Sequence, residues 1–135
     1  MSAAAIELTP RIQRHLENDV VIWMATLGAA RPHAVPVWFW WDGSSFLIYS
    51  IPGQKVRDVE SNPNVQLHLN TDRGGDFVVR FEGEAEILRG HPLANKVPKY
   101  MAKYRERVRG YGWTPKVFAE QYHVAIRVRP TRVRS

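Results

Sequence analysis

Cysteine is absent from the 135 residues of this chain, which excludes disulfide cross-links, thiolate metal sites and cysteine nucleophiles. Long apolar runs are missing as well: the most apolar stretch, residues 20–27, has the length of a strand, whereas a membrane helix needs roughly 18 residues. Residues 1–5 lack the basic stretch followed by an apolar one that marks a secretory signal. We therefore expect a cytoplasmic protein that does not act at a membrane.

The common catalytic motifs are also missing. The chain has no G-x-G-x-x-G after a strand, no Walker loop, no H-E-x-x-H and no G-x-S-x-G. Its five histidines lie singly, without the spacing that gathers metal ligands: His15, His33, His68, His91 and His123. We predict no metal site, and an enzyme with this sequence would rely on a bound cofactor for the difficult chemistry.

Charge is distributed unevenly along the chain, although the net value is only +6. Residues 1–88 contain 7 Lys or Arg against 11 Asp or Glu, whereas residues 89–135 contain 12 against 2. Such a basic half attracts polyanions, or it simply forms a solvated face. The densest aromatic cluster, at residues 38–41, lies outside this basic half, which argues against a nucleic-acid partner.

Apolar and β-branched runs separated by turn residues predict a mainly β protein. Six strands are expected, at residues 20–27, 35–41, 46–50, 65–70, 77–88 and 124–128. Helices are expected at residues 10–18, 54–61, 92–109 and 115–121. Asp42-Gly43 is a strong hairpin signal. Hairpins joined by short helices favour a six-stranded antiparallel barrel over a parallel sheet, in a single domain spanning residues 1–135.

The segment from Tyr49 to Arg57 has the composition of an anion site. A strand ends at Ser50, a Pro-Gly turn follows, and the next helix opens with Lys55 and Arg57. A hydroxyl, a point charge, a bidentate guanidinium and free N–H groups at a helix start together suit a phosphate. The alternative is a helix whose solvated cations pair with Asp58 or Glu60.

An aromatic run follows Pro36. Alternation places Val37, Phe39 and Trp41 on one face of the strand and Trp38 and Trp40 on the other. A barrel core needs only one apolar face, so the second face predicts another buried surface. That surface is a subunit interface or the site of a flat aromatic ligand.

Taken together, these segments resemble the pyridoxamine-phosphate-oxidase-like split barrels. The resemblance is carried by residues 25–28 (ATLG), 31–39 (RPHAVPVWF), 54–65 (QKVRDVESNPNV), 83–86 (GEAE) and 126–134 (IRVRPTRVR). The last segment is most similar to the small branch that uses the deazaflavin coenzyme F420.

The resemblance implies a homodimer with two cofactor sites at the interface and a small-molecule substrate. Its implied function is an F420-dependent oxidoreductase that transfers a hydride between the deazaflavin and an unsaturated organic substrate. An FMN-binding oxidase or reductase of the same fold and a non-catalytic cofactor-binding protein are the alternatives. The arginine-rich segments of the FMN oxidases have no match after the strand at residues 65–70, which argues against vitamin B6 oxidation.

The resemblance also implies the contacts of the cofactor. Ser50, Lys55 and Arg57 would hold the phosphate, and the strand at Pro36, Val37 and Trp38 would lie along the ring system. Tyr49, Ile51 and Val56 would line the same groove. Trp113 and Lys116 would enter from the partner subunit, and the basic half after Arg89 offers cations for the polyglutamate tail of F420.

Overall fold

The computed structural model describes residues 6–135, and within them the chain is mainly β. The strands are β1 (Val21–Leu27), β2 (Pro32–Trp38), β3 (Trp40–Trp41), β4 (Phe46–Ser50), β5 (Asn64–His68), β6 (Arg80–Leu88) and β7 (Val124–Arg134). The helices are α1 (Pro10–Asn18), α2 (Gln54–Ser61), the short 3-10 helix η1 (Ala94–Lys96), α3 (Pro98–Gly110) and α4 (Pro115–Gln121). The seven strands pair antiparallel in one sheet, in the order β2-β1-β5-β6-β7-β4-β3.

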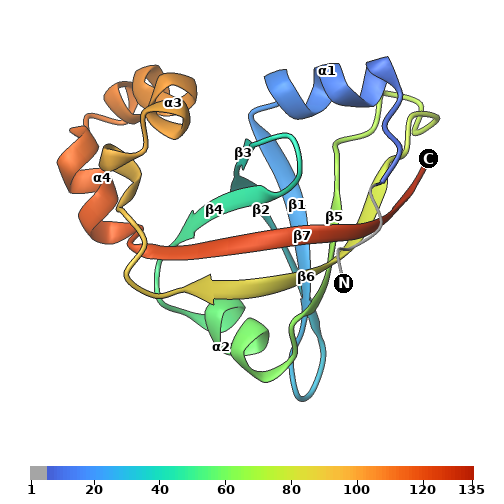
Figure 1. Ribbon diagram of the computed structural model, residues 1–135, viewed down its shortest axis with the longest axis horizontal. Helices are drawn as coiled ribbons and strands as arrows, with labels where there is room; N and C mark the ends of the chain where they lie inside the picture. The colour runs from blue at the N-terminus through green and yellow to red at the C-terminus, as the bar shows by residue number, and fades with distance from the viewer. Residues whose placement is uncertain (1–5) are drawn as a thin grey trace.

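The sheet is curled into a half-barrel. Figure 1 shows the long strands β6 and β7 running across β1, β2 and β5. Helices α1 and α2 lie on opposite sides of the curled sheet, and both contribute apolar side chains to its core. Helices α3 and α4 lie together at one end of β7. No helix of residues 6–135 is long and apolar enough to cross a membrane.

The prediction of six strands is wrong by one, because the expected strand at residues 35–41 is broken at Phe39. The backbone N–H of Phe39 donates to the Tyr104 hydroxyl (2.7 Å), and the Lys103 ammonium donates to the Phe39 carbonyl (2.8 Å). Side chains of α3 thus take the backbone bonds that a neighbouring strand would otherwise make. The strand therefore ends at Trp38 as β2 and resumes at Trp40 as β3.

Other boundaries move for similar reasons. β2 begins at Pro32, earlier than predicted, because it pairs with β1 as far as Leu27. β7 continues to Arg134, beyond the predicted end at Val128, because it pairs with β6 along nearly its whole length. The helix predicted over residues 92–109 is divided into η1 and α3, and Pro98 occupies the start of α3, where its missing N–H costs nothing. The strands predicted at residues 65–70 and 77–88 are shorter as β5 and β6.

Two apolar layers hold the structure together. The first fills the inside of the half-barrel and includes Val37, Phe39 and the partly buried Trp41. The second lies between the outer face of the sheet and helices α3 and α4, and includes Trp38 and Trp40. The predicted alternation of this strand is therefore confirmed. Helices of the same chain pack on this second face: Trp38 stacks on Tyr104 (4.6 Å between ring centroids) and on Phe118.

Helix α2, which carries the predicted phosphate residues, is fixed to the barrel by Asp58. This carboxylate is buried (2% exposed) and accepts hydrogen bonds from the Thr26 hydroxyl (2.8 Å) and from the Gln54 amide (2.7 Å). Burial raises the pKa of Asp58, but these hydrogen bonds and the nearby His33 and Arg57 outweigh it and hold the pKa below its usual value. Asp58 is therefore ionised at neutral pH and ties α2 to β1.

Candidate functional site

A pocket of about 320 Å³ lies where β2, β4 and α2 meet the helical layer of α3 and α4. Five of the predicted cofactor residues line it: Pro36, Val37, Trp38, Tyr49 and Lys55. Five further residues come from α3, α4 and the segments beside them: Tyr100, Tyr111, Trp113, Phe118 and Tyr122. Its volume is at the lower end of the range for small-molecule sites, which suits a ring-sized part of a ligand.

The walls of the pocket are largely aromatic. The ring of Tyr100 meets Tyr49 edge-on at 4.9 Å, and Phe118 stacks on Tyr122 at 4.9 Å and lies 6.2 Å from Trp113. Such flat, apolar and mutually braced surfaces favour a planar ligand and keep water from its faces.

Lys55 is the cation of the pocket. Its ammonium donates to the Ser50 hydroxyl (2.9 Å), which in turn donates to the Ile51 carbonyl (2.7 Å). The side chain is half-buried, and this burial lowers the pKa of Lys55. None of the ion pairs among residues 6–135 includes Lys55. A partly desolvated cation without a carboxylate partner favours binding of an anion.

The acidic residues that could have neutralised this corner are engaged elsewhere. Asp58 is bound by Thr26 and Gln54, as described above, and Glu60 pairs with Arg89 at 3.3 Å. For Lys55, the alternative of a simple ion pair on the surface of α2 is therefore not what the structure shows.

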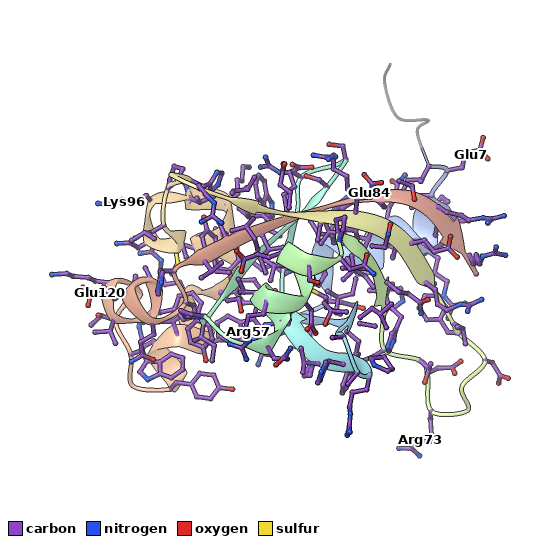
Figure 2. All side chains as sticks on the ribbon, turned by 90° about the horizontal axis from the view of Figure 1, so that it is seen from below. Glu7, Arg57, Arg73, Glu84, Lys96 and Glu120 are labelled. Atoms are coloured by element: carbon purple, nitrogen blue, oxygen red, sulfur yellow. The ribbon has the colours of Figure 1, made fainter. Side chains whose placement is uncertain are left out.

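The remaining predicted residues take different positions. Ile51 is half-exposed at the end of β4, and Arg57 is exposed on α2, where its guanidinium donates to Gln54 (3.0 Å); Figure 2 labels Arg57 on this helix. Val56 packs into the barrel core and does not face the pocket. The structure thus brings Ser50 and Lys55 together and leaves Arg57 on the solvent side of the same helix.

The N-terminus of α2 adds donors to this corner. Its N-cap residue is Gly53, which has no side chain that could accept hydrogen bonds from the first turn. The first N–H groups of a helix have no partners within the helix, and the helix dipole places partial positive charge there. A phosphate at this position would find both backbone donors and the Lys55 ammonium.

Tyr49 is buried beside Lys55 and is held in a fixed orientation. Its hydroxyl donates to the Pro92 carbonyl (2.6 Å). Burial raises the pKa of Tyr49 to about 12, against an opposing influence of Arg127. This phenol therefore remains neutral, and its proton forms a hydrogen bond with the protein backbone.

The sequence reasoning missed the helical side of the pocket. Residues 92–109 were predicted as a helix in the basic half of the chain, with no buried face assigned to it. Tyr100 and Tyr104 are four residues apart on one face of α3, and this spacing indicates that the face is buried. Trp113, expected from a partner subunit, lines the pocket from within the same chain. Lys116, also expected from the partner subunit, lies on α4, and its ammonium is 3.9 Å from the Glu120 carboxylate.

The loop between β5 and β6 lies away from the pocket. Figure 2 shows Arg73 at the tip of this loop, on the opposite side of the molecule from Lys96 and Glu120, which mark the helical end. Within residues 6–135, no group of three His, Asp or Glu side chains is arranged to hold a metal ion. Among the residues that line the pocket, Lys55 carries the charged side chain.

The comparison with protein families gives one match. The family model for pyridoxamine 5'-phosphate oxidase matches residues 8–135. No curated protein matches the chain significantly.

Several solved structures are similar in fold. A conserved hypothetical protein from Mycobacterium tuberculosis has a TM-score of 0.74 at 21% identity, over 99% of this chain and 88% of that one. An F420 reductase has a TM-score of 0.67 at 21% identity, over 94% and 98% of the two chains. HutZ, the heme storage protein from Vibrio cholerae, has a TM-score of 0.62 at 15% identity, over 92% and 90%. At these identities the likeness concerns the fold alone.

Proposed function

Because the chain belongs to the pyridoxamine 5'-phosphate oxidase family, whose fold is the FMN-binding split barrel, we propose that it is an F420-dependent oxidoreductase. In this proposal it transfers a hydride between the deazaflavin and an unsaturated organic substrate. The observation that carries it is Lys55, a half-buried cation that lines an aromatic pocket and is absent from the ion pairs of the described residues.

The phosphate is held at the corner between β4 and α2. Lys55 supplies the charge, Ser50 a hydroxyl, and the first turn of α2 its free N–H groups. Arg57, exposed on the same helix, reaches the phosphate from the solvent side. With a phosphate bound, the Lys55 ammonium would exchange its hydrogen bond to the Ser50 hydroxyl for a charge-assisted one to a phosphate oxygen.

The aromatic pocket would hold the ring system, with Pro36, Val37 and Trp38 of β2 along it. When bound, the deazaflavin supplies the carbon that accepts or releases the hydride. The chain itself contributes binding and exclusion of water: Trp38 is held by its stacking on Tyr104, and Tyr49 by its bond to Pro92. Ile51 is half-exposed directly after β4 and outside the pocket lining, and Val56 anchors α2 in the core.

The proposed assembly is a homodimer with a cofactor site at each interface. Apolar side chains remain exposed on the β1–β2 hairpin and at the end of β4, namely Leu27 (50%), Val35 (39%) and Ile51 (49%). A second copy of the chain would cover them. Size-exclusion chromatography with light scattering should give about twice the chain mass of 15.6 kDa.

The proposal is tested by titrating the protein with oxidised and reduced F420, followed by absorbance and fluorescence. We expect micromolar or tighter binding, and an affinity about tenfold weaker or worse in K55A, because a charged hydrogen bond to the phosphate is lost. R73A is the control, since Arg73 is an exposed cation at the tip of the β5–β6 loop, outside the basic half and away from the helical end of the molecule (Figure 2). Failure of both forms of F420 to bind would end the proposal.

FMN is the second candidate, because the family fold is an FMN-binding one. A yellow protein with an FMN spectrum that ignores F420 would favour it. Binding of F420 without turnover of any unsaturated compound would instead indicate a cofactor-binding protein that is not an enzyme.

A further inference from the structure

The mouth of the pocket carries one exposed aromatic ring. Among the residues that line the pocket, Pro36 and Tyr111 are exposed, and the others are buried or partly buried. A residue that lines a pocket and is also exposed lies where the pocket opens to solvent. Pro36 reaches this opening from β2, and Tyr111 reaches it from the turn that joins α3 to α4 (Figure 1). Tyr111, which is 62% exposed, is therefore the aromatic side chain at the mouth.

The backbone fixes the position of Tyr111. This residue is the C-cap of α3, and Gly112 follows it with a φ of 79°, in the left-handed region that favours glycine. The Gly112 N–H donates to the Arg109 carbonyl (2.8 Å), and the next N–H, that of Trp113, donates to the Val108 carbonyl (3.1 Å). These two hydrogen bonds form a Schellman motif, a compact way of ending a helix. Tyr111 thus projects from a turn whose geometry is set before any ligand binds.

The ring of Tyr111 is braced from within the protein and open to solvent. It stacks on the ring of Trp113, with 5.1 Å between the centroids and an angle of 27° between the planes. The ring of Trp38 is tilted against it at 6.3 Å. The large exposed fraction of Tyr111 leaves apolar ring surface in contact with water. A second ring placed on this surface would bury apolar area and add an aromatic pair.

The size of the pocket separates the two reactants of the proposed reaction. Its volume of about 320 Å³ suits one ring-sized group. When the cofactor ring occupies this space, a second reactant has to approach through the mouth, where Tyr111 lies. A flat conjugated ring gains more from this contact than a puckered saturated ring of the same size, because only a flat ring can meet the phenol face to face.

We propose that the second reactant is a planar conjugated molecule that stacks on Tyr111 at the mouth of the pocket. This inference rests on the proposed function, in which the deazaflavin ring occupies the pocket itself. Tyr111 is thereby a binding residue that favours flat unsaturated substrates over puckered ones, whereas Lys55 holds the phosphate of the cofactor.

The test measures binding to the protein saturated with oxidised F420, which has no hydride to donate, so no turnover occurs. Two probes carry the same unsaturated ketone: benzylideneacetone, whose ring is flat, and its analogue with a cyclohexyl ring in place of the phenyl ring. Isothermal titration calorimetry gives the dissociation constant of each probe. We expect Y111A to lower the preference for the flat probe by about fivefold relative to the unmodified protein, the typical contribution of an aromatic pair. Comparing this ratio between proteins removes the general difference in hydrophobicity between the probes.

Two control variants show whether the ring of Tyr111 makes this contact. Y111F keeps the ring and should retain the preference of the unmodified protein. V117A shortens an exposed apolar side chain of α4 that lies outside the pocket lining, and it should retain the preference as well. The inference is overturned if Y111A keeps the full preference, or if Y111F loses as much of it as Y111A does, because the hydroxyl and not the ring would then make the contact.

Titration with F420 alone distinguishes this inference from the proposed function. We expect Y111A to weaken F420 binding far less than K55A does. An equal loss in the two variants would place Tyr111 against the cofactor and overturn the inference. If the F420-saturated unmodified protein binds neither probe, the inference is overturned and the proposed cofactor stands. If the unmodified protein does not bind F420, the proposed function fails and this inference fails with it.

Discussion

Replacing Asp58 by alanine should loosen α2, the helix that carries Lys55, from the barrel. The carboxylate accepts two hydrogen bonds, and hydrogen bonds to a charged group contribute about 1.5–3 kcal/mol each. The two partners do not lose equally: Gln54 is exposed, so water replaces its lost acceptor, whereas Thr26 is buried (4% exposed) and stays without one. We therefore expect D58A to lower the free energy of unfolding by about 2–4 kcal/mol.

Urea denaturation followed by tryptophan fluorescence measures this loss. E60A is the control on the same helix, because Glu60 makes only an exposed ion pair with Arg89, and its removal should cost less than about 1 kcal/mol. The lowered pKa of Asp58 also sets a sign: its contribution is complete above the usual carboxyl pKa and is lost as the pH falls through the folded value. Equal stabilities of D58A and E60A at pH 7 would show that Asp58 does not hold α2 on the barrel.

Two further predictions concern the helical layer and the sheet. Burial lowers the pKa of Lys103 to about 8, against an opposing influence of Asp19, so the unfolded chain holds this proton at pH values where the folded chain has lost it. The free energy of unfolding should therefore rise from pH 8 to 10, and K103M should flatten that rise in denaturation curves. A Cβ at Gly83 would lie 2.6 Å from the Arg129 carbonyl oxygen, so G83A should lower the free energy of unfolding by about 1–3 kcal/mol. At Gly110 a Cβ meets open space, so G110A should not be destabilised by such a clash. Equal melting temperatures of the two variants would contradict this.

Local chemistry explains why much of the sheet could be predicted. The Asp42-Gly43 signal marks the β3–β4 hairpin, where the Asp42 N–H donates to the Ser45 carbonyl and Gly43 adopts a φ of 99°. The strand predicted at residues 77–88 is present as the shorter β6, in which Phe81 and Ala85 face the core. These features depend on neighbours in sequence, which a single chain displays directly.

The parts that could not be predicted depend on distant partners. The strand breaks at Phe39 because its N–H donates to Tyr104, a residue 65 positions away, and no residue near Phe39 indicates this contact. The C-terminal half of β7 is rich in arginine and lies beyond the strand predicted at residues 124–128, yet Arg129 pairs with Glu86 (3.2 Å) and Arg134 with Glu82 (3.5 Å) across the sheet. Ion pairs between neighbouring strands stabilise a strand at residues that would otherwise be isolated charges.

The same distinction applies to the candidate site. Lys55 and Ser50 are close in sequence, so a shared anion site could be predicted from the sequence, and the structure places the Lys55 ammonium 2.9 Å from the Ser50 hydroxyl. The aromatic wall comes from helices that follow far later in the chain, and Tyr111 has no distinguishing motif of its own. Only the fold shows that it lies at the mouth of the pocket.

The central claim is that Lys55 binds the phosphate of a flavin-type cofactor, and one comparison of affinities tests it most directly. Titrations of the unmodified protein and K55A with F420, and with the same deazaflavin ring lacking the phosphate, separate the phosphate contact from the ring contacts. We expect the unmodified protein to prefer the phosphorylated ligand by about tenfold or more, and K55A to lose most of this preference while its affinity for the bare ring is unchanged. An equal preference for the phosphate in both proteins would contradict it.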